Sequence, residues 1–455
     1  MGAAMSDEIR GPLQLSGIQM PTWILRYNAD GICESPLTRG DLLERLRAEE
    51  HSDVILFSHG WNNDFDAASR LYGRFLAAFE GLLPSHPANR TFTPVFVGIT
   101  WPSTWLVFDN GPKIAGEESL EGKRTEASID VMSRAIAEAG TPDKAARFRE
   151  LMGKPTVTAE ESEELSRLML PLLASASDDE IGDGARDLTA SDLASAAEAT
   201  ALVEHSSTAP ADLDDFGGTG DGGATAGPKA AGALSFLDPR TYLRLASVWQ
   251  MKDRAGRVGA RAMSALMRDI QTATSARIHA VGHSYGCKVM LSGICAGPAF
   301  VRPLDSLLLL QPACSYLCFA ASVPGTRRAG GYRRALDPSM VRHPIFSTYS
   351  RKDLPLHATF HLSLRRDSDA GEPLIAASAT SAGDPPSRYA ALGGYGPRGA
   401  GEELRDPIPA AGEDYGSLGT ASIIGLDGSK GRISGHGDIA KPETAWALHR
   451  LVFRK

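Results

Sequence analysis

Short apolar runs recur along the chain, and most of them end in a polar or glycine-containing turn. Val54–Phe57 and Val95–Ile99 are two such runs, and the segment 65–83 between them carries apolar residues at helical spacing. A continuous apolar run of this length predicts a strand buried on both faces, and the intervening spacing predicts an amphipathic helix. The first hundred residues therefore predict a βαβ unit with parallel strands.

Four further apolar runs lie in the second half of the chain. They cover residues 278–281, 306–310, 345–349 and 421–425. Helical spacing over residues 251–273, and again after residue 285, predicts crossover helices. The pattern predicts an α/β protein with a mostly parallel sheet flanked by helices. Its core comprises residues 51–105 and 240–455, and residues 1–50 precede it as an N-terminal segment.

Residues 106–239 interrupt this alternation. The stretches 128–140 and 159–176 have helical spacing, whereas residues 212–233 are rich in Gly, Ala and Asp and poor in large apolar side chains. Such a composition predicts a loop or linker. We therefore expect a large helical insertion. It either forms a lid over the site, which moves on the glycine-rich stretch 217–227, or packs on the flank of the core, for example as a dimer contact.

Composition and charge restrict the partners more than the fold. A formal net charge of −8 and the lack of a basic stripe argue against nucleic acid as a partner. The five cysteines are odd in number and lack the paired spacing of metal ligands, which predicts buried free thiols and no metal site. No segment has the apolar length of a signal peptide or a membrane span. We therefore expect a cytoplasmic protein.

The stretch "IHAVGHSYGCKVM" places Ser284 between Gly282 and Gly286, where a predicted strand gives way to a predicted helix. This is the arrangement of a nucleophile elbow, in which the serine adopts a strained backbone conformation and its neighbours must lack bulk. The alternative is a glycine-rich turn whose serine only caps a helix. A base, an acid and an oxyanion loop elsewhere in the chain distinguish the two.

A serine hydroxyl needs a histidine to accept its proton, and that histidine needs a carboxylate to orient it. After a nucleophile elbow the acid comes next in the chain and the histidine last. Asp353 follows the predicted strand 345–349, and His436 lies in a glycine-flanked loop before the last predicted helix. Both positions are at the carboxyl ends of strands, where α/β sheets build their sites. We therefore predict the catalytic residues Ser284, Asp353 and His436.

Other acids and histidines fit this order less well. Asp337 precedes a strand, and His449 falls inside the last helix. The remaining competitors are Asp367 and Asp369 for the acid, in a polar loop, and His343, His357 and His361 for the base, too close to the acid strand.

An oxyanion hole requires two backbone amides aimed at the developing alkoxide. The residue after the nucleophile, Tyr285, supplies one amide. The loop "SHGWNND" is expected to supply the other from Trp61, because Gly60 permits a close approach, with His59 ordering the loop. The aromatic residues expected to line a substrate pocket at these strand ends are Trp101 and Trp105.

Four motifs in this order, "SHGWNND", "GHSYG", "SRKD" and "SGHGD", resemble the α/β-hydrolase superfamily. The resemblance covers roughly residues 50–105 and 245–455, and it is strongest to a little-characterised bacterial subfamily of serine hydrolases with an HGW oxyanion loop. The resemblance implies acyl transfer to water through a covalent acyl-serine, without a cofactor. The departure from the family is the long insertion before the elbow strand, where ordinary members have a short connection.

The leading expectation for function is a carboxylic ester hydrolase acting on a small-molecule acyl ester. An amidase or peptidase uses the same three residues, since the pocket selects the leaving group. A third possibility is a non-catalytic hydrolase fold that binds partners through its helical insertion. It predicts that one of the three residues is missing, and all three are present.

Overall fold

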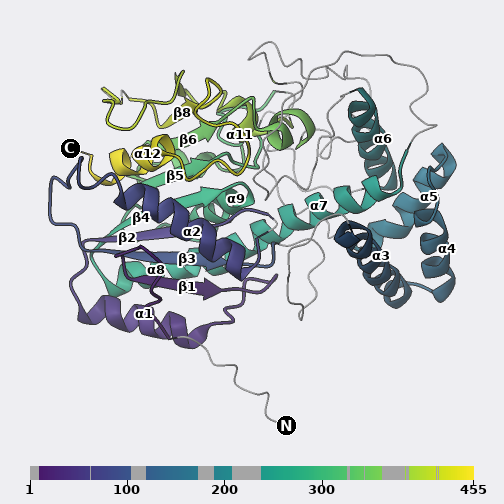
Figure 1. Ribbon diagram of the computed structural model, residues 1–455, viewed down its shortest axis with the longest axis horizontal. Helices are drawn as coiled ribbons and strands as arrows, with labels where there is room; N and C mark the ends of the chain where they lie inside the picture. Colours follow the sequence, from purple (N-terminus) through teal and green to yellow (C-terminus); the bar gives the residue numbers. More distant parts are fainter. Residues whose placement is uncertain are drawn as a thin grey trace, which may run out of the picture.

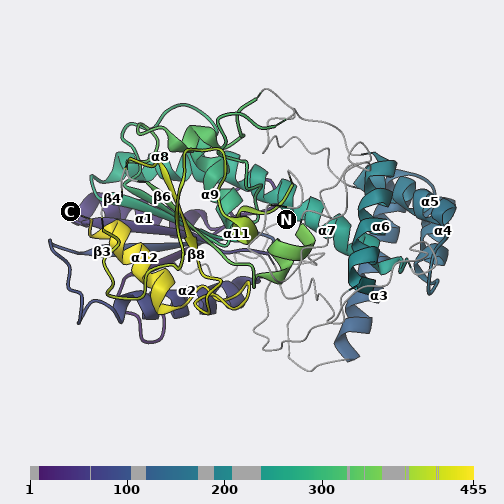
Figure 2. The same ribbon diagram turned by 90° about the horizontal axis from the view of Figure 1, so that it is seen from above.

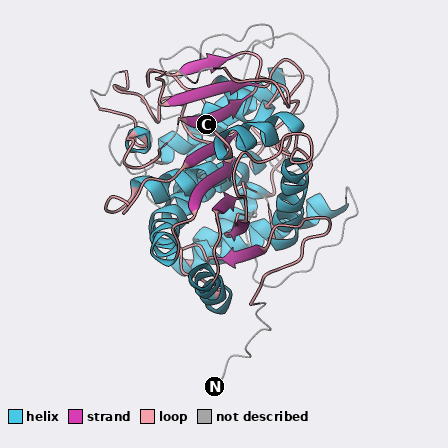
Figure 3. Ribbon diagram, turned by 90° about the vertical axis from the view of Figure 1, so that its left-hand side faces the viewer, coloured by secondary structure: helices cyan, strands magenta, loops and turns pink. Residues whose placement is uncertain are grey.

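An eight-stranded parallel sheet lies at the centre of the described part of the molecule, in the order β1-β3-β2-β4-β5-β6-β8-β7 (Figure 1). The computed structural model describes residues 10–61, 63–103, 119–172, 189–206, 237–324, 328–342, 344–360, 385, 389–416, 418 and 420–454. Figure 3 shows the twist of this sheet, with helices on both sides of it.

Six of the strands confirm the predicted apolar runs. They are β2 (Asp53–Ser58), β3 (Pro94–Thr100), β4 (Arg277–His283), β5 (Ser306–Leu310), β6 (Ile345–Tyr349) and β8 (Ile423–Asp427). The two edge strands, β1 (Thr22–Arg26) and β7 (Glu403–Arg405), were not predicted. An edge strand contacts only one neighbour and needs no long apolar run, and β7 carries charged residues at both of its ends.

Period-two alternation sends the side chains of each strand to two separate apolar clusters. On β4, Ile278 and Ala280 face one side, where the helices α1 (Pro36–Ala48), α7 (Arg240–Val258), α8 (Ser264–Ala273) and α9 (Tyr285–Cys295) pack. Val281 faces the other side, which α2 (Phe65–Glu80) and α12 (Pro442–Val452) cover. Figure 2 shows these two helical layers with the sheet between them.

Residues 22–48 add the strand β1 to the sheet and the helix α1 to one of its faces. β1 pairs in parallel with β3, and the buried leucines of α1, Leu42, Leu43 and Leu46, join the same apolar cluster as α8 and α9. The sheet therefore begins upstream of residue 51, where the sequence pattern placed the start of the core.

The insertion contributes four helices in its described part, placed beyond the carboxyl ends of the strands (Figure 1). They are α3 (Ser119–Ala139), α4 (Pro142–Met152), α5 (Ala159–Met169) and α6 (Ala190–Ser206). A capping box of Thr158 and Glu161 starts α5, and Leu165 on this helix is fully buried. Leu173 and the glycine-rich stretch 217–227 lie outside the described residues.

Helix α7 connects the insertion to the sheet domain. Near its start, the hydroxyl of Tyr242 is hydrogen-bonded to Ser162 on α5. Further along, the Tyr285 hydroxyl on α9 donates to the carbonyl of Val248 at 3.4 Å. One continuous helix therefore contacts both the insertion and the first residue after Ser284.

Several short elements complete the described chain. They are the 3₁₀ turns η1 (Leu170–Leu172) and η5 (Arg333–Leu336), the π-helical turns η4 (Gly259–Met263) and η6 (Pro355–Thr359), and the short helix α11 (Leu392–Tyr395). All five cysteines are free, and Cys287, Cys314 and Cys318 are buried. Among the described helices, none has the length and hydropathy that a membrane crossing demands.

Candidate active site

Ser284 occupies a sharp turn between β4 and α9. Its backbone has φ 55° and ψ −125°, a conformation that a residue with a Cβ adopts only under strain. The flanking glycines are required by close packing. A Cβ on Gly282 would lie 2.6 Å from the Cα of Cys287, and one on Gly286 would collide with the carbonyl oxygens of Ser58 and His59. The turn thus closes against β2, and only glycine fits on either side of the serine.

The Ser284 side chain is fully buried, and its Oγ has no hydrogen-bond partner among the described residues. Its backbone is well held, since its amide donates to the carbonyl of Leu310 at 3.0 Å and its carbonyl accepts from the amide of Ala313 at 3.2 Å. A buried hydroxyl without a partner is unfavourable in a purely structural serine. The arrangement therefore leaves a buried hydroxyl oxygen without a hydrogen bond in the described structure, on a firmly held turn.

His436 and Asp353 meet at the same edge of the sheet. Asp353 follows β6, His436 follows β8, and the histidine Nδ1 lies 2.8 Å from Asp353 Oδ2, with both side chains buried. The other carboxylate oxygen, Oδ1, accepts from the amide of Leu356 at 3.1 Å. Because the carboxylate can only accept, Nδ1 carries the proton in this pair, and in the neutral imidazole Nε2 is the basic nitrogen.

His283 connects the elbow to the His436 loop. Its Nε2 donates to the carbonyl of His436 at 2.9 Å, and the two rings lie 4.9 Å apart between centroids. Burial, and then the proximity of His436, hold the pKa of His283 well below its usual value, so this ring stays neutral. Since His283 immediately precedes Ser284, this contact brings the serine and the His436 loop together.

The loop after β2 packs directly on Ser284. A Cβ on Gly60 would lie 2.6 Å from the Cβ of Ser284, so the loop backbone is in van der Waals contact with the serine. Trp61 is 4% exposed, and its ring meets that of Tyr285 edge-on at 6.5 Å between centroids. Tyr285 is the first residue of α9, a position whose amide has no acceptor within the helix. Both amides predicted for an oxyanion hole therefore belong to segments that flank the serine.

His59 orders this loop. Its Nδ1 donates to the carbonyl of Gly60 at 2.8 Å, which leaves Nε2 to accept from the amide of Trp101 at 3.3 Å. The indole of Trp101 stacks on the imidazole with 5.7 Å between centroids and donates to the carbonyl of His59. Burial lowers the pKa of His59 to about 4. Trp101 is thus buried against the loop, at 3% exposure.

The buried His59 predicts a loss of stability in mild acid. Its pKa is about 6.5 when unfolded and about 4 when folded, so the unfolded chain binds the proton first. The free energy of unfolding is therefore highest above pH about 6.5. It falls as the pH drops toward 4, and the protonation of His59 accounts for a loss of about 3 kcal/mol over the whole range. Urea unfolding between pH 7 and 4 measures this slope. His59→Asn should have a shallower slope than the wild type, although the neutral His283 retains part of it. Equal slopes would contradict the assignment.

The competing residues lie elsewhere or outside the description. Asp337 is exposed and accepts from the amide of Ser339, and His449 donates to the carbonyl of His86. His357 is buried near Asp353, where its ring stacks on Tyr395 and its Nδ1 donates to the carbonyl of Gly394. The candidates that lie outside the described residues are Trp105, His343, His361, Asp367 and Asp369.

Another serine, histidine and aspartate are hydrogen-bonded to one another at the opposite, amino ends of the strands. His279 Nδ1 is 2.8 Å from Ser306 Oγ, and its Nε2 is 2.9 Å from Asp53 Oδ1. Burial raises the pKa of Asp53, but hydrogen bonds from His279 and Arg90 outweigh it and hold that pKa below its usual range. Arg90 occupies both carboxylate oxygens, and Ser306 lies within regular strand. This network ties three strands together and lacks an elbow.

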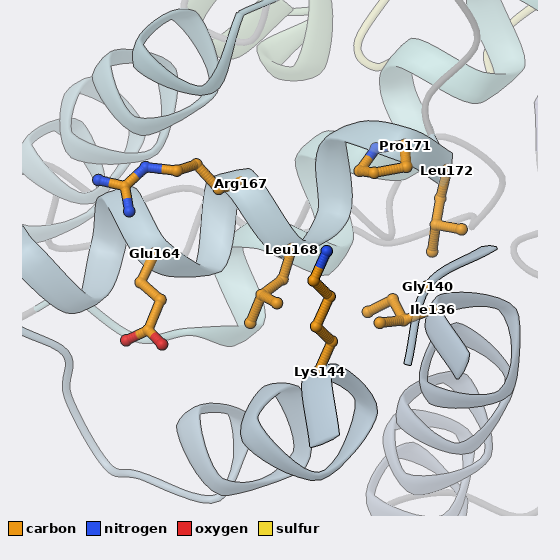
Figure 4. Close-up of a pocket in the computed structure, with 8 residues that line it drawn as sticks. All are labelled: Ile136, Gly140, Lys144, Glu164, Arg167, Leu168, Pro171 and Leu172. Atoms are coloured by element: carbon orange, nitrogen blue, oxygen red, sulfur yellow. The ribbon is translucent and has the colours of Figure 1, made fainter. Parts of the chain in front are cut away.

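A pocket of about 280 Å³ lies in the insertion (Figure 4). It is lined by Ile136, Gly140, Lys144, Glu164, Arg167, Leu168, Pro171 and Leu172. All of these residues belong to α3, α4, α5, η1 and the turn after α3, and none comes from the sheet. The pocket is therefore separate from the elbow.

Sequence reasoning missed two residues that contact the His436 loop, His283 and Gln311. His283 was visible within "GHSYG", but its role depends on which loop the fold brings above β4. Gln311 follows β5 directly, at a strand end where polar residues merit attention.

Residues 37–145 match the model of a family described as alpha/beta hydrolase of unknown function (DUF900). The match runs from α1 into α4, so it includes β2 and the loop that contacts Ser284. Ser284, Asp353 and His436 lie beyond it. No curated protein and no solved structure gives a significant match.

Proposed function

We propose that this protein, an α/β hydrolase, cleaves carboxylic esters through an acyl-serine intermediate. The observation that carries the proposal is the strained, buried Ser284 at a nucleophile elbow. Its neighbour His283 is hydrogen-bonded to the backbone carbonyl of His436, whose Nδ1 is hydrogen-bonded to Asp353. A turn that serves only to start a helix gains nothing from a strained serine with an orphan hydroxyl.

The proposed reaction uses Ser284, His436 and Asp353 in the roles of a catalytic triad. Ser284 Oγ attacks the ester carbonyl while His436 Nε2 accepts the hydroxyl proton, and Asp353 stabilises the imidazolium. The resulting oxyanion receives hydrogen bonds from the amides of Tyr285 and Trp61. Collapse of this intermediate expels the alcohol, which takes the proton from His436. Water, deprotonated by His436, then attacks the acyl-serine. The second intermediate collapses to the carboxylic acid as Ser284 Oγ leaves and takes the proton back from His436.

The surroundings of Ser284 favour an ester with apolar groups. Trp61 and Tyr285 contact each other beside the serine, and Tyr285 also contacts Phe360 at 6.4 Å between ring centroids. Aromatic side chains beside the proposed nucleophile suit an acyl chain or an apolar alcohol. An amidase with the same three residues is the second candidate, and a non-catalytic binding module is the third.

A substrate panel combined with an active-site probe tests these alternatives. We expect a fluorophosphonate to label Ser284, and p-nitrophenyl esters to be cleaved much faster than the matching p-nitroanilides. Faster anilide cleavage would indicate an amidase, and folded protein that neither reacts with the probe nor cleaves a substrate would indicate a binding module.

The panel also tests the insertion, since α7 lies against Tyr285. As a lid it should slow bulky acyl esters, and replacing residues 125–235 with a short linker should remove that selectivity.

A further inference from the structure

Two residues other than glycine have positive φ in the described part of the chain, Ser284 at 55° and Gln311 at 40°. They stand side by side, because each directly follows a strand, β4 or β5, and the last residues of these strands, His283 and Leu310, are paired. Backbone strain of this kind concentrates at functional sites and persists only where the surroundings enforce it. The strain at Ser284 belongs to the elbow, whereas that at Gln311 needs its own explanation.

The turn that contains Gln311 holds the backbone of Ser284 from both sides. Leu310 accepts the amide hydrogen of Ser284, and Ala313 donates to the Ser284 carbonyl. The amide of Gln311 itself donates to Thr348 Oγ1 on β6 at 3.0 Å. The turn therefore connects the nucleophile position to the two strands that follow it in the sheet.

The side chain of Gln311 extends to the His436 loop. It is fully buried, and its Nε2 donates to the carbonyl of His436 at 2.9 Å and to that of Gly435 at 3.1 Å. Its Oε1 accepts from Thr348 Oγ1 at 3.4 Å. Because both loop carbonyls only accept, they require the amide nitrogen, which fixes the orientation of the side chain.

We propose that Gln311 is a positioning residue for the reaction, one that sets the distance between Ser284 and His436. The proposal rests on the proposed function. Gln311 holds the serine through its backbone and the histidine loop through its side chain, while His283 donates to the same His436 carbonyl. Two donors on one carbonyl fix the loop more firmly than its turn alone would. The imidazole is thereby held against the elbow as well as against Asp353.

The backbone alone would favour glycine at position 311. Glycine adopts positive φ without strain and would preserve the turn. A glutamine in this conformation is explained by its side chain, which supplies both hydrogen bonds to the loop.

Gln311→Gly tests this directly, because it relieves the strain while removing both contacts. We expect a lower melting temperature from the lost buried contacts, an unchanged KM, and kcat and fluorophosphonate labelling per folded molecule reduced about 10- to 100-fold, as for other supporting groups displaced from an active site. A merely structural residue would alter stability and leave the rate per folded molecule unchanged.

The matched control is Gln271→Ala. Gln271 is also a buried glutamine whose Nε2 donates to a carbonyl, that of Arg302, but it lies on α8 away from the elbow. Its loss should leave kcat and labelling within twofold of the wild type. The proposal is overturned if Gln311→Gly does the same, or if both variants lose activity in proportion to their stability.

A measurement independent of turnover separates this proposal from the proposed function. The proton between His436 Nδ1 and Asp353 Oδ2 should give a far-downfield proton NMR resonance, identified by its absence in Asp353→Asn. In Gln311→Gly it should shift or broaden, whereas Gln271→Ala should leave it in place. If the wild type proves inactive while this resonance behaves as expected, the proposed function fails and the positioning of His436 by Gln311 stands. An unmoved resonance contradicts the positioning role.

Discussion

Ser284→Ala should lower kcat for short p-nitrophenyl esters by about 10⁶-fold, the scale seen when a serine hydrolase loses its nucleophile. The loss follows because Ser284 supplies the hydroxyl that attacks the ester in the proposed reaction. The fold should survive, since alanine keeps the Cβ and the backbone conformation. Removing a buried hydroxyl that has no partner in the described structure should even raise stability slightly. Initial-rate kinetics and thermal unfolding on the same preparation measure both effects.

Ser306→Ala is the matched control for this experiment. Ser306 is also buried and hydrogen-bonded to a histidine that is in turn hydrogen-bonded to an aspartate, but at the other ends of the strands. Its replacement should cost about 1 kcal/mol of stability through the lost hydrogen bond and leave the rate of ester cleavage unchanged. Retention of more than one per cent of activity by Ser284→Ala would show that another group is the nucleophile.

Asp353→Asn should lower kcat by about 10⁴-fold, more than the removal of a negative charge alone suggests. The amide of Leu356 donates to Oδ1, so the asparagine must place its oxygen there and turn its NH₂ toward His436. That group can only donate, so Nδ1 of the imidazole must become the acceptor. The proton then resides on Nε2, so this nitrogen can no longer accept the proton of Ser284.

Asp353→Ala provides the comparison, because alanine leaves the tautomer of His436 unconstrained. We expect it to retain more activity than Asp353→Asn, although it removes more of the side chain. The measurement is kcat and KM for one ester across both variants, with far-UV circular dichroism to verify folding. Wild-type rates in Asp353→Asn would move the acid to another residue, and equal losses in the two variants would contradict the tautomer argument.

The interior of the sheet was predictable because its strands are buried on both faces. Such strands need continuous apolar runs, and β2 through β6 display them. The edges were not predictable on this basis. In β7 a single leucine stands between two charged residues, and in β1 the apolar run is only three residues long although residues 22–25 are buried. Runs this short do not separate a strand from a loop.

The candidate site was predictable where chain order and strand ends constrain it. These constraints single out Asp353 and His436, which the fold brings to within a hydrogen bond of each other. Contacts between residues that are distant in the sequence could not be predicted in this way. Nothing in the sequence indicates that Gln311, 125 residues before His436, would donate to its carbonyl. The contact of Tyr285 with α7 likewise depends on the path of the insertion.

The position of β2 has a consequence for synthesis on the ribosome. β2 pairs with β3 on one side and with β4 on the other, but β3 ends at residue 100 and β4 begins at residue 277. At translation rates of about 5 to 20 residues per second, the backbone amides and carbonyls on one edge of β2 wait roughly 10 to 35 s for their partner strand. During that interval the nascent sheet exposes an unpaired strand of the kind that aggregates.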